Sequence, residues 1–256
     1  MFKITFLGTG TSQGIPIIGS KHPVCLSQNP KDKRLRVSIS ISWKKYNYII
    51  DCGPDFRQQL LRNPIDRLDG VLFTHEHSDH TAGLDDIRPF FFRQGNIDFY
   101  ASQKVFTELD KRFSYIMEDF NKYPGAPSVN KHLVNKNKPF KLNGIEVIPI
   151  EVLHHNLTVL GYRFGNFAYL TDVKTIPNEE LNKLKNIDVL VLSALRIERH
   201  PSHLNLEEAL SLVALINPKK TYFTHISHLL GFHDEVESIL PKNVHLAYDT
   251  LQITSN

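Results

Sequence analysis

Between residues 74 and 80 the chain reads Thr74-His75-Glu76-His77-Ser78-Asp79-His80. Three imidazoles and two carboxylates in so short a segment have no ordinary role in a folded core. The apolar run just before it is predicted to be a strand. At a strand end, His75 and His77 can project to one side, while a turn at Ser78 brings Asp79 and His80 to a neighbouring point. Imidazole and carboxylate ligands without a thiolate suit Zn²⁺, Mn²⁺ or Fe²⁺, so the segment predicts the start of two adjacent metal sites.

Four other segments also end a predicted strand with a residue that can bind metal. The residues concerned are Asp51, the pair His154 and His155, Asp172 and His225. Each one alone is a weak signal, because a histidine at a strand end is often just hydrogen-bonded and an aspartate there often forms a turn. Together with the first cluster they predict one complete site. Strand alternation favours His154 over His155, although one residue more or less in the loop would exchange them.

The pattern along the chain predicts an α/β protein, because short β-rich runs alternate with helical stripes. A length of 256 residues fits one domain, 1–256. A helix is expected from Gln103 to Phe120 and another over 179–185. A third begins at the capping box of Asn205 and Glu208. The segment 121–143, rich in Lys, Asn and Pro, is predicted to be a long surface loop. Strands are expected at 2–7, 37–43, 46–51, 70–73, 145–153, 160–164, 167–171, 189–194 and 221–224.

Composition excludes several classes of protein. Thirty Lys and Arg against 27 Asp and Glu give a net charge of +3, too close to neutral to indicate a nucleic-acid or membrane surface. Two cysteines, Cys25 and Cys52, exclude a disulfide scaffold. No apolar run approaches the ~18 residues of a membrane span, and the first residues do not resemble a cleavable signal. We therefore expect a cytoplasmic protein with no membrane partner.

The histidine pattern resembles that of a known family. The motif HxHxDH at His75 to His80, followed by His154, Asp172 and His225, is similar to that of the metallo-β-lactamase fold of binuclear metallohydrolases. Three further segments, 7–16, 84–90 and 224–228, resemble the PhnP-like phosphodiesterase branch, which is related to RNase Z. The resemblance spans nearly the whole chain. It implies an αββα sandwich with the metal site at the strand ends.

The resemblance also implies a role for each ligand position. His75, His77 and His154 would hold the first divalent metal, Zn or Mn. Asp79, His80 and His225 would hold the second, and Asp172 would bridge the two. Asp51 resembles a carboxylate that holds the remaining N–H of a ligand imidazole and fixes its tautomer. A simple turn residue is the alternative for that position.

The expected catalytic residues are His203 and Asp79, the latter also a metal ligand. His203 stands at the head of the helical segment 202–210, where the PhnP-like branch and RNase Z carry a histidine beside the metals. The resemblance implies metal-bound hydroxide attack on phosphorus, with His203 as general acid for the leaving alkoxide. The expected substrate is a small cyclic phosphate or a nucleotide-like diester.

Three other functions compete with this one. RNase Z-like cleavage of tRNA comes second, because no Gly-rich inserted arm is visible to grip tRNA, which makes tRNA an unexpected partner. A lactonase or β-lactamase leaves His203 unexplained. A non-catalytic binding protein on the same fold conflicts with competent residues at all seven ligand positions. The family also suggests a homodimer.

A second metal site is an open expectation near the N-terminus. Relatives in the PhnP-like branch often place a cysteine-rich structural zinc loop there, whereas this chain has one thiol in the corresponding run 20–25. His22, Cys25 and His228 could supply three of the four ligands of an additional structural Zn. Loss of the site, with Cys25 as an inert buried residue, is the equal alternative.

Overall fold

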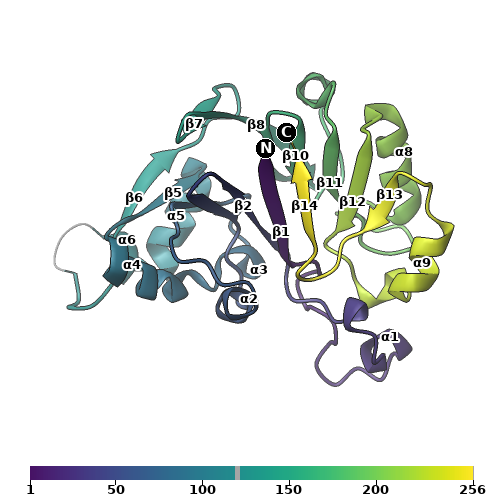
Figure 1. Ribbon diagram of the computed structural model, residues 1–256, viewed down its shortest axis with the longest axis horizontal. Helices are drawn as coiled ribbons and strands as arrows, with labels where there is room; N and C mark the ends of the chain where they lie inside the picture. Colours follow the sequence, from purple (N-terminus) through teal and green to yellow (C-terminus); the bar gives the residue numbers. More distant parts are fainter. Residues whose placement is uncertain (119–121, 256) are drawn as a thin grey trace.

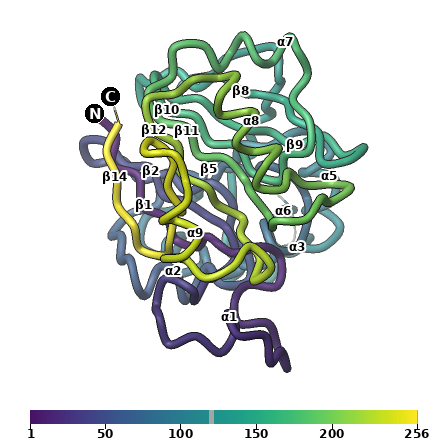
Figure 2. Tube along the Cα trace, turned by 90° about the vertical axis from the view of Figure 1, so that its right-hand side faces the viewer, coloured from purple at the N-terminus to yellow at the C-terminus, as the bar shows by residue number. Residues whose placement is uncertain are grey.

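The computed structural model describes residues 1–118 and 122–255, and shows two mixed seven-stranded sheets. The first has the order β14 (Gln252–Ser255), β1 (Phe2–Gly8), β2 (Ser38–Trp43), β3 (Tyr46–Ile50), β4 (Gly70–Leu72), β5 (Ile97–Ala101) and β6 (Val129–Leu133). The second has the order β13 (Val244–Leu246), β12 (Lys220–Thr224), β11 (Val189–Ser193), β10 (Phe167–Leu170), β9 (Leu157–Phe164), β8 (Ile145–His154) and β7 (Phe140–Leu142). Antiparallel pairing of β1 with β14 places the two termini side by side (Figures 1 and 2).

Helices cover the outer faces of both sheets. Apolar side chains of α2, α4 and α5 pack on the first sheet, and those of α7, α8 and α9 pack on the second. Figure 1 shows α4 and α5 beside the first sheet and α8 and α9 beside the second. Four layers result, which confirms the αββα sandwich. The helices are α1 (Pro23–Leu26), α2 (Phe56–Arg62), α3 (Ser78–Thr81), α4 (Arg88–Gln94), α5 (Gln103–Arg112), α6 (Ser114–Met117), α7 (Asn178–Leu181), α8 (Leu206–Ile216) and α9 (His233–Ile239), with 3₁₀ turns at Pro30–Asp32, Leu84–Ile87, Asn182–Leu184 and His228–Leu230.

The central core lies between the two sheets and is rich in aromatic residues. Strand β2 contributes Ile39, Ile41 and Trp43, the alternating positions that the sequence predicts to face inward. The Trp43 ring stacks on Tyr48 at 5.0 Å between centroids and meets Phe2 edge-on at 5.8 Å. Such large buried rings supply much of the hydrophobic stabilisation of a fold. This core fixes the two sheets against each other.

Two sequence-based assignments are wrong. The segment 121–143 is no long loop, because it contains β6 and β7, the edge strands of the two sheets. Four of the five side chains of β6 are exposed, and this polarity hides the strand in the sequence. The helix expected from Gln103 to Phe120 ends at Arg112, since Phe113 adopts φ −130° before the short α6 begins. Phe120 itself lies outside the described residues.

Several element boundaries also differ from expectation. Strand β9 begins at Leu157 rather than 160, because it completes a hairpin with β8. The helix expected over 179–185 is a single turn, α7, followed by a 3₁₀ turn. The capping box of Asn205 and Glu208 is confirmed at the start of α8. In the part of the chain that is described, no helix is long and apolar enough to cross a bilayer.

The topology directs parallel strands of both sheets towards one edge. Strands β3 to β6 are parallel neighbours in the first sheet, and β10 to β13 are parallel neighbours in the second. Loops that leave the carboxyl ends of parallel strands are where open α/β sheets bind ligands. Asp51, Asp172 and His225 lie in such loops, and His75 follows β4 in the same way.

Candidate metal centre

Site residues follow the strand ends of both sheets. Asp51 comes directly after β3, His75 shortly after β4, Asp172 after β10 and His225 after β12, while His154 is the last residue of β8. Asp51, Asp172 and His225 adopt positive φ angles of 63°, 55° and 55°. Non-glycine residues adopt this conformation rarely and at some cost, and such strain concentrates at functional sites. The fold therefore accepts strained backbone at three of the positions that carry the site.

Asp79, His80 and His225 form one tight group of donor atoms. Their ligand atoms lie within 4.8 Å of one another. His80 Nε2 is 3.3 Å from Asp79 Oδ2, and His225 Nε2 is 3.7 Å from the same oxygen. These are the three residues that the resemblance assigns to the second metal.

The residues assigned to the first metal also meet. His75 Nε2 is 3.0 Å from His77 Nδ1. The ring of His154 lies 5.5 Å from that of His77 and 6.1 Å from that of His75, centroid to centroid. His155, in contrast, is exposed in the turn between β8 and β9. The structure thus brings His154 to the cluster and leaves His155 outside it.

Asp172 lies between the two groups. One of its oxygens is 3.2 Å from His80 Nε2 and the other is 3.2 Å from His225 Nε2. Its donor atoms also cluster with His75 and His80, and separately with His154 and His203. A carboxylate in this place can reach both predicted metals, as the bridging role requires.

The donor set fits divalent metal ions. His80 Nε2 and His225 Nε2 are buried and have no hydrogen-bond partner among the described residues, although carboxylate oxygens lie close by. Buried polar atoms are normally paired, and a metal ion would satisfy both nitrogens and the oxygens around them. Imidazole and carboxylate donors without sulfur are the set that Zn²⁺ or Mn²⁺ accepts.

Asp51 holds His80 from behind. Its Oδ1 accepts the Thr74 backbone N–H at 2.8 Å, and its Oδ2 accepts the Thr74 hydroxyl at 2.8 Å and His80 Nδ1–H at 2.7 Å. With the Nδ1 proton held by Asp51, Nε2 faces the centre, where it could offer its lone pair to a metal ion. This is the supporting role that the resemblance implies for Asp51.

Charge is strongly polarised within the centre. Burial lowers the pKa of His75 well below its usual value. Burial acts against the charge of Asp172, but His225 and His80 outweigh it and hold the pKa of Asp172 well below normal. Burial likewise opposes the charge of His80, yet Asp172, Asp79 and Asp51 raise its pKa well above normal. Ionised carboxylates surrounding a buried histidine favour a cation at this point.

His203 lies against the same centre. Its ring centroid is 4.3 Å from that of His154 and 5.0 Å from that of His225, and its Nδ1 is 3.8 Å from Asp172 Oδ1. Burial, followed by the charge of His225, lowers the pKa of His203 to about 3. These effects favour the neutral imidazole form of His203.

His200 is a site neighbour that the sequence interpretation missed. Its ring centroid lies 5.0 Å from that of His203, and its Nδ1 accepts the backbone N–H of Ser202 at 3.3 Å. The carbonyl of Ser202 in turn accepts His154 Nδ1–H at 2.7 Å. The signal was the spacing of His200 and His203, three residues apart on either side of a Pro-Ser pair.

The N-terminal cluster is only partly assembled. The rings of His22 and His228 meet at 4.7 Å between centroids. Cys25 packs instead in a small apolar cluster with Ile15 and Val24. Across residues 1–118 and 122–255, no group of three donors within 4.8 Å includes these residues. An additional structural Zn thus stays a prediction without support from the geometry.

Comparison with known proteins gives consistent matches. Residues 46–226 match the model of the β-lactamase superfamily domain. The chain is 40% identical over 252 residues to an octanoyltransferase of Porphyromonas gingivalis, covering 98% of this chain but 51% of that protein. It is 25% identical over 195 residues to ribonuclease Z of Methanococcus maripaludis, covering 73% of this chain and 54% of the relative. The chain thus spans about half the length of these two proteins.

A solved structure matches along the whole chain. It is described as a new diphosphatase from the PhnP family, with a TM-score of 0.93 and 38% sequence identity. The match covers 100% of this chain and 98% of that one. The fold of this chain therefore agrees with that structure over all the residues compared.

Proposed function

This chain belongs to the metallo-β-lactamase superfamily, and we propose that it is a binuclear metal-dependent phosphodiesterase acting on small cyclic phosphates or nucleotide-like diesters. One observation carries the proposal: His203 lies beside Asp172, the carboxylate that would be shared by the two metals, within a centre of histidines and aspartates. Hydrolysis of a phosphodiester releases an alkoxide that needs a proton, and a histidine at this place is positioned to supply one.

Seven residues would hold the two metal ions, and Asp51 supports one of these residues. His75, His77 and His154 would hold one ion, Asp79, His80 and His225 the other, and Asp172 both. When bound, two divalent ions would make water acidic enough to supply hydroxide near neutral pH and would neutralise charge on a phosphate oxygen. Asp51 keeps His80 in the required tautomer through its hydrogen bond to Nδ1. The clustering of these donor atoms supports a site that is already arranged for metals and a phosphate before they bind.

His203 is proposed to move the proton. Its Nδ1 faces Asp172 at 3.8 Å, so the leaving oxygen would meet the opposite, Nε2, side of the ring. Burial keeps the imidazole neutral, but an anionic phosphate placed beside it would raise its pKa and favour the imidazolium. A proton held at Nε2 could then pass to the leaving alkoxide.

The related structure suggests a second candidate substrate class. It is described as a diphosphatase and matches over the full length of this domain, so a phosphoanhydride is a competing target for the same centre. A phosphate leaving group needs little help from an acid, whereas an alkoxide needs much. The dependence on His203 therefore separates the two classes. The octanoyl transfer named for the P. gingivalis relative belongs to a protein about twice as long as the matched part.

The test compares leaving groups. The chain reconstituted with Zn²⁺ or Mn²⁺ would be assayed on a 2′,3′-cyclic nucleotide, on bis(p-nitrophenyl) phosphate and on a dinucleoside diphosphate, with a chelated sample as control. We expect metal-dependent hydrolysis of the cyclic nucleotide that falls ~100-fold or more in His203→Ala. The fall should be smaller for the nitrophenyl ester. If only the dinucleoside diphosphate is hydrolysed, phosphoanhydrides rather than phosphodiesters are the substrate class. If none of the three compounds is hydrolysed while two metals are bound, the proposal is rejected.

A further inference from the structure

Lys174 occupies a junction between three residues of the centre. It lies two residues after Asp172, in the loop that leaves β10. Its backbone N–H donates to the carbonyl of Leu153 at 2.7 Å, and Leu153 immediately precedes His154. Thr175 and Leu153 are bonded in both directions, by N–H to carbonyl contacts of 3.1 Å and 2.9 Å. The main chain at Lys174 thus ties the strand end that carries Asp172 to the one that carries His154.

The side chain of Lys174 reaches the loop that carries His203. Its Nζ donates to the His203 carbonyl at 3.3 Å and to both carboxylate oxygens of Glu208 at 2.9 Å. Glu208 Oε2 also accepts the Asn205 backbone N–H at 3.0 Å, as half of the capping box of α8. One ammonium group therefore holds the backbone of His203 and the start of the helix that follows it.

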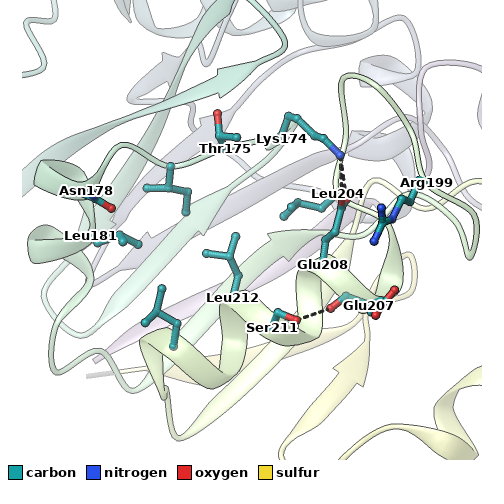
Figure 3. A pocket seen from close by; sticks show the side chains of 12 residues that line it. Lys174, Thr175, Asn178, Leu181, Arg199, Leu204, Glu207, Glu208, Ser211 and Leu212 are labelled. Atoms are coloured by element: carbon teal, nitrogen blue, oxygen red, sulfur yellow. Dashed lines mark hydrogen bonds and ion pairs between the residues drawn. The ribbon is translucent and has the colours of Figure 1, made fainter.

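A groove lies beside the loop that carries His203, so this loop depends on the Lys174–Glu208 ion pair to hold it in place. A cavity of about 550 Å³ opens between the β10–α7 segment and α8, and Lys174, Leu204 and Glu208 are part of its wall. Figure 3 shows the Lys174–Glu208 contact at one end of the groove, with the side chains of Leu181 and Leu212 further along it. Because the groove lies open beside the loop, the loop has room to relax on that side once the ion pair is lost.

We propose that Lys174 is a positioning residue that sets the ring of His203 against the metal centre. The proposal rests on the general-acid role proposed above for His203. In this role Lys174 acts through His203 rather than on the phosphate. It holds the His203 carbonyl and Glu208, and its charge is balanced by Glu208. Its removal should therefore misplace His203 while leaving the predicted metal ligands in place.

The chain offers a closely matched control. Lys183 is as buried as Lys174, with 23% against 22% of its side chain exposed. Like Lys174, it binds a glutamate, Glu180, at 2.8 Å and donates to backbone carbonyls, those of Lys136 and Pro149. Lys183 lies in the 3₁₀ turn after α7, and none of these partners belongs to the centre. Lys183→Met thus removes an equivalent set of contacts from another place.

The experiment compares Lys174→Met, Lys174→Arg, Glu208→Gln and Lys183→Met in the metal-loaded chain. Glutamine at position 208 can still complete the capping box, so Glu208→Gln removes the charge and one of the two oxygens that accept from Lys174. We expect Lys174→Met to lower kcat on a 2′,3′-cyclic nucleotide ~10- to 100-fold with little change in KM. The loss on bis(p-nitrophenyl) phosphate should be smaller. Lys174→Arg should recover most of the rate, Glu208→Gln should lose part of it, and Lys183→Met should behave as wild type.

Two further readouts distinguish positioning from a general loss of structure. When His203 is already replaced by Ala, Lys174→Met should lower kcat no further, because there is no longer an imidazole to position. In imidazole NMR spectra of the metal-loaded chain, the His203 signal, identified by its absence in His203→Ala, should shift in Lys174→Met and not in Lys183→Met. Metal content should stay at the wild-type value in both.

The contrary outcomes separate a failure of the positioning role from a failure of the proposed function. Equal losses in Lys174→Met and Lys183→Met, an additive double variant, or an unmoved His203 signal would each overturn the positioning role. If the wild-type chain hydrolyses no diester, the proposed function fails. The His203 signal then still decides whether Lys174 sets its position.

Discussion

Asp51 shows how much the centre depends on a residue that is not itself a predicted ligand. It is fully buried, adopts a positive φ and receives three hydrogen bonds, one of them from His80. Burial is the largest influence on it and raises its pKa, against the opposing effect of His80. Its three hydrogen bonds offset the cost of burying a carboxylate, and the one from His80 places it where it can orient that imidazole.

Replacing this carboxylate should weaken metal binding. In Asp51→Asn the side chain keeps its size but loses the charge that holds the Nδ1 proton of His80. We expect metal affinity to fall ~10- to 100-fold. Metal content after dialysis against a weak chelator measures this directly. The control is Asp69→Asn, which removes a buried carboxylate that accepts the Asn47 N–H and pairs with Arg67. Equal metal loss in both variants would contradict the role given to Asp51.

His233 should make stability depend on pH. It is 3% exposed, its Nδ1 lies 3.0 Å from Arg34, and burial, followed by the charge of Arg34, lowers its pKa to about 4. Below the unfolded pKa of 6.5 the unfolded chain therefore binds a proton that the folded chain refuses, so stability falls as the pH falls from 6.5 towards 4.

The difference between two chains isolates this effect. His233→Gln keeps an acceptor for Arg34 but cannot titrate. Between about pH 7.5 and about pH 5, the wild type should lose about 2 kcal/mol more stability than this variant. Urea unfolding at the two pH values measures both losses. Identical losses would show that His233 takes up its proton equally in the folded and unfolded chain.

At the scale of elements, local signals predicted some features and tertiary pairing decided others. The capping box of Asn205 and Glu208 is a short-range pattern, and it marks the start of α8 correctly. Strand β6 is stabilised by pairing with β5 and exposes most of its side chains, so its own sequence carries no alternation of burial. The Gln103–Phe120 helix was overextended because its apolar period continues past the break at Phe113.

The loop after β3 is pressed against the motif that carries Asp79. A Cβ added to Gly53 would overlap the carbonyl oxygen of Asp79. Neither atom can rotate away, because the oxygen belongs to the backbone and the position of a Cβ is fixed by it. Gly53→Ala should therefore destabilise the chain by about 1–3 kcal/mol and reduce metal content. Chemical unfolding and metal analysis measure the two effects. Gly144→Ala is the comparison, because Gly144 has φ +87° but open space around it. A Gly53→Ala chain with full metal content would contradict the packing argument.

On the scale of the whole molecule, the centre joins the two halves of the sandwich. Asp51, His75 and His80 come from loops of the first sheet, and Asp172 and His225 from loops of the second. The sequence could predict that these residues lie just after strands, because each follows an apolar run. Their convergence required the two sheets to face each other, which no local pattern encodes. The choice of His154 over His155 depended in the same way on the β8–β9 hairpin.

Metal should consequently stabilise the whole sandwich. Ions that bind the folded chain alone add about 4 kcal/mol when free metal exceeds the dissociation constant ~1,000-fold. Thermal unfolding should thus occur at a clearly higher temperature with Zn²⁺ than with a chelator, and the midpoint should rise with metal concentration. A midpoint that does not respond to metal would mean that the ions do not bridge the two halves.

We propose that two ions, held by the seven predicted ligands, make this chain a phosphodiesterase. A titration of metal-free protein with Zn²⁺ or Mn²⁺ tests this, with bound metal and the rate of 2′,3′-cyclic nucleotide hydrolysis recorded together. The rate should rise until two equivalents are bound and then level off, and Asp172→Ala should gain no activity at any metal concentration. Two bound equivalents without hydrolysis would contradict the proposal. A rate that is already maximal with one equivalent bound would also contradict it.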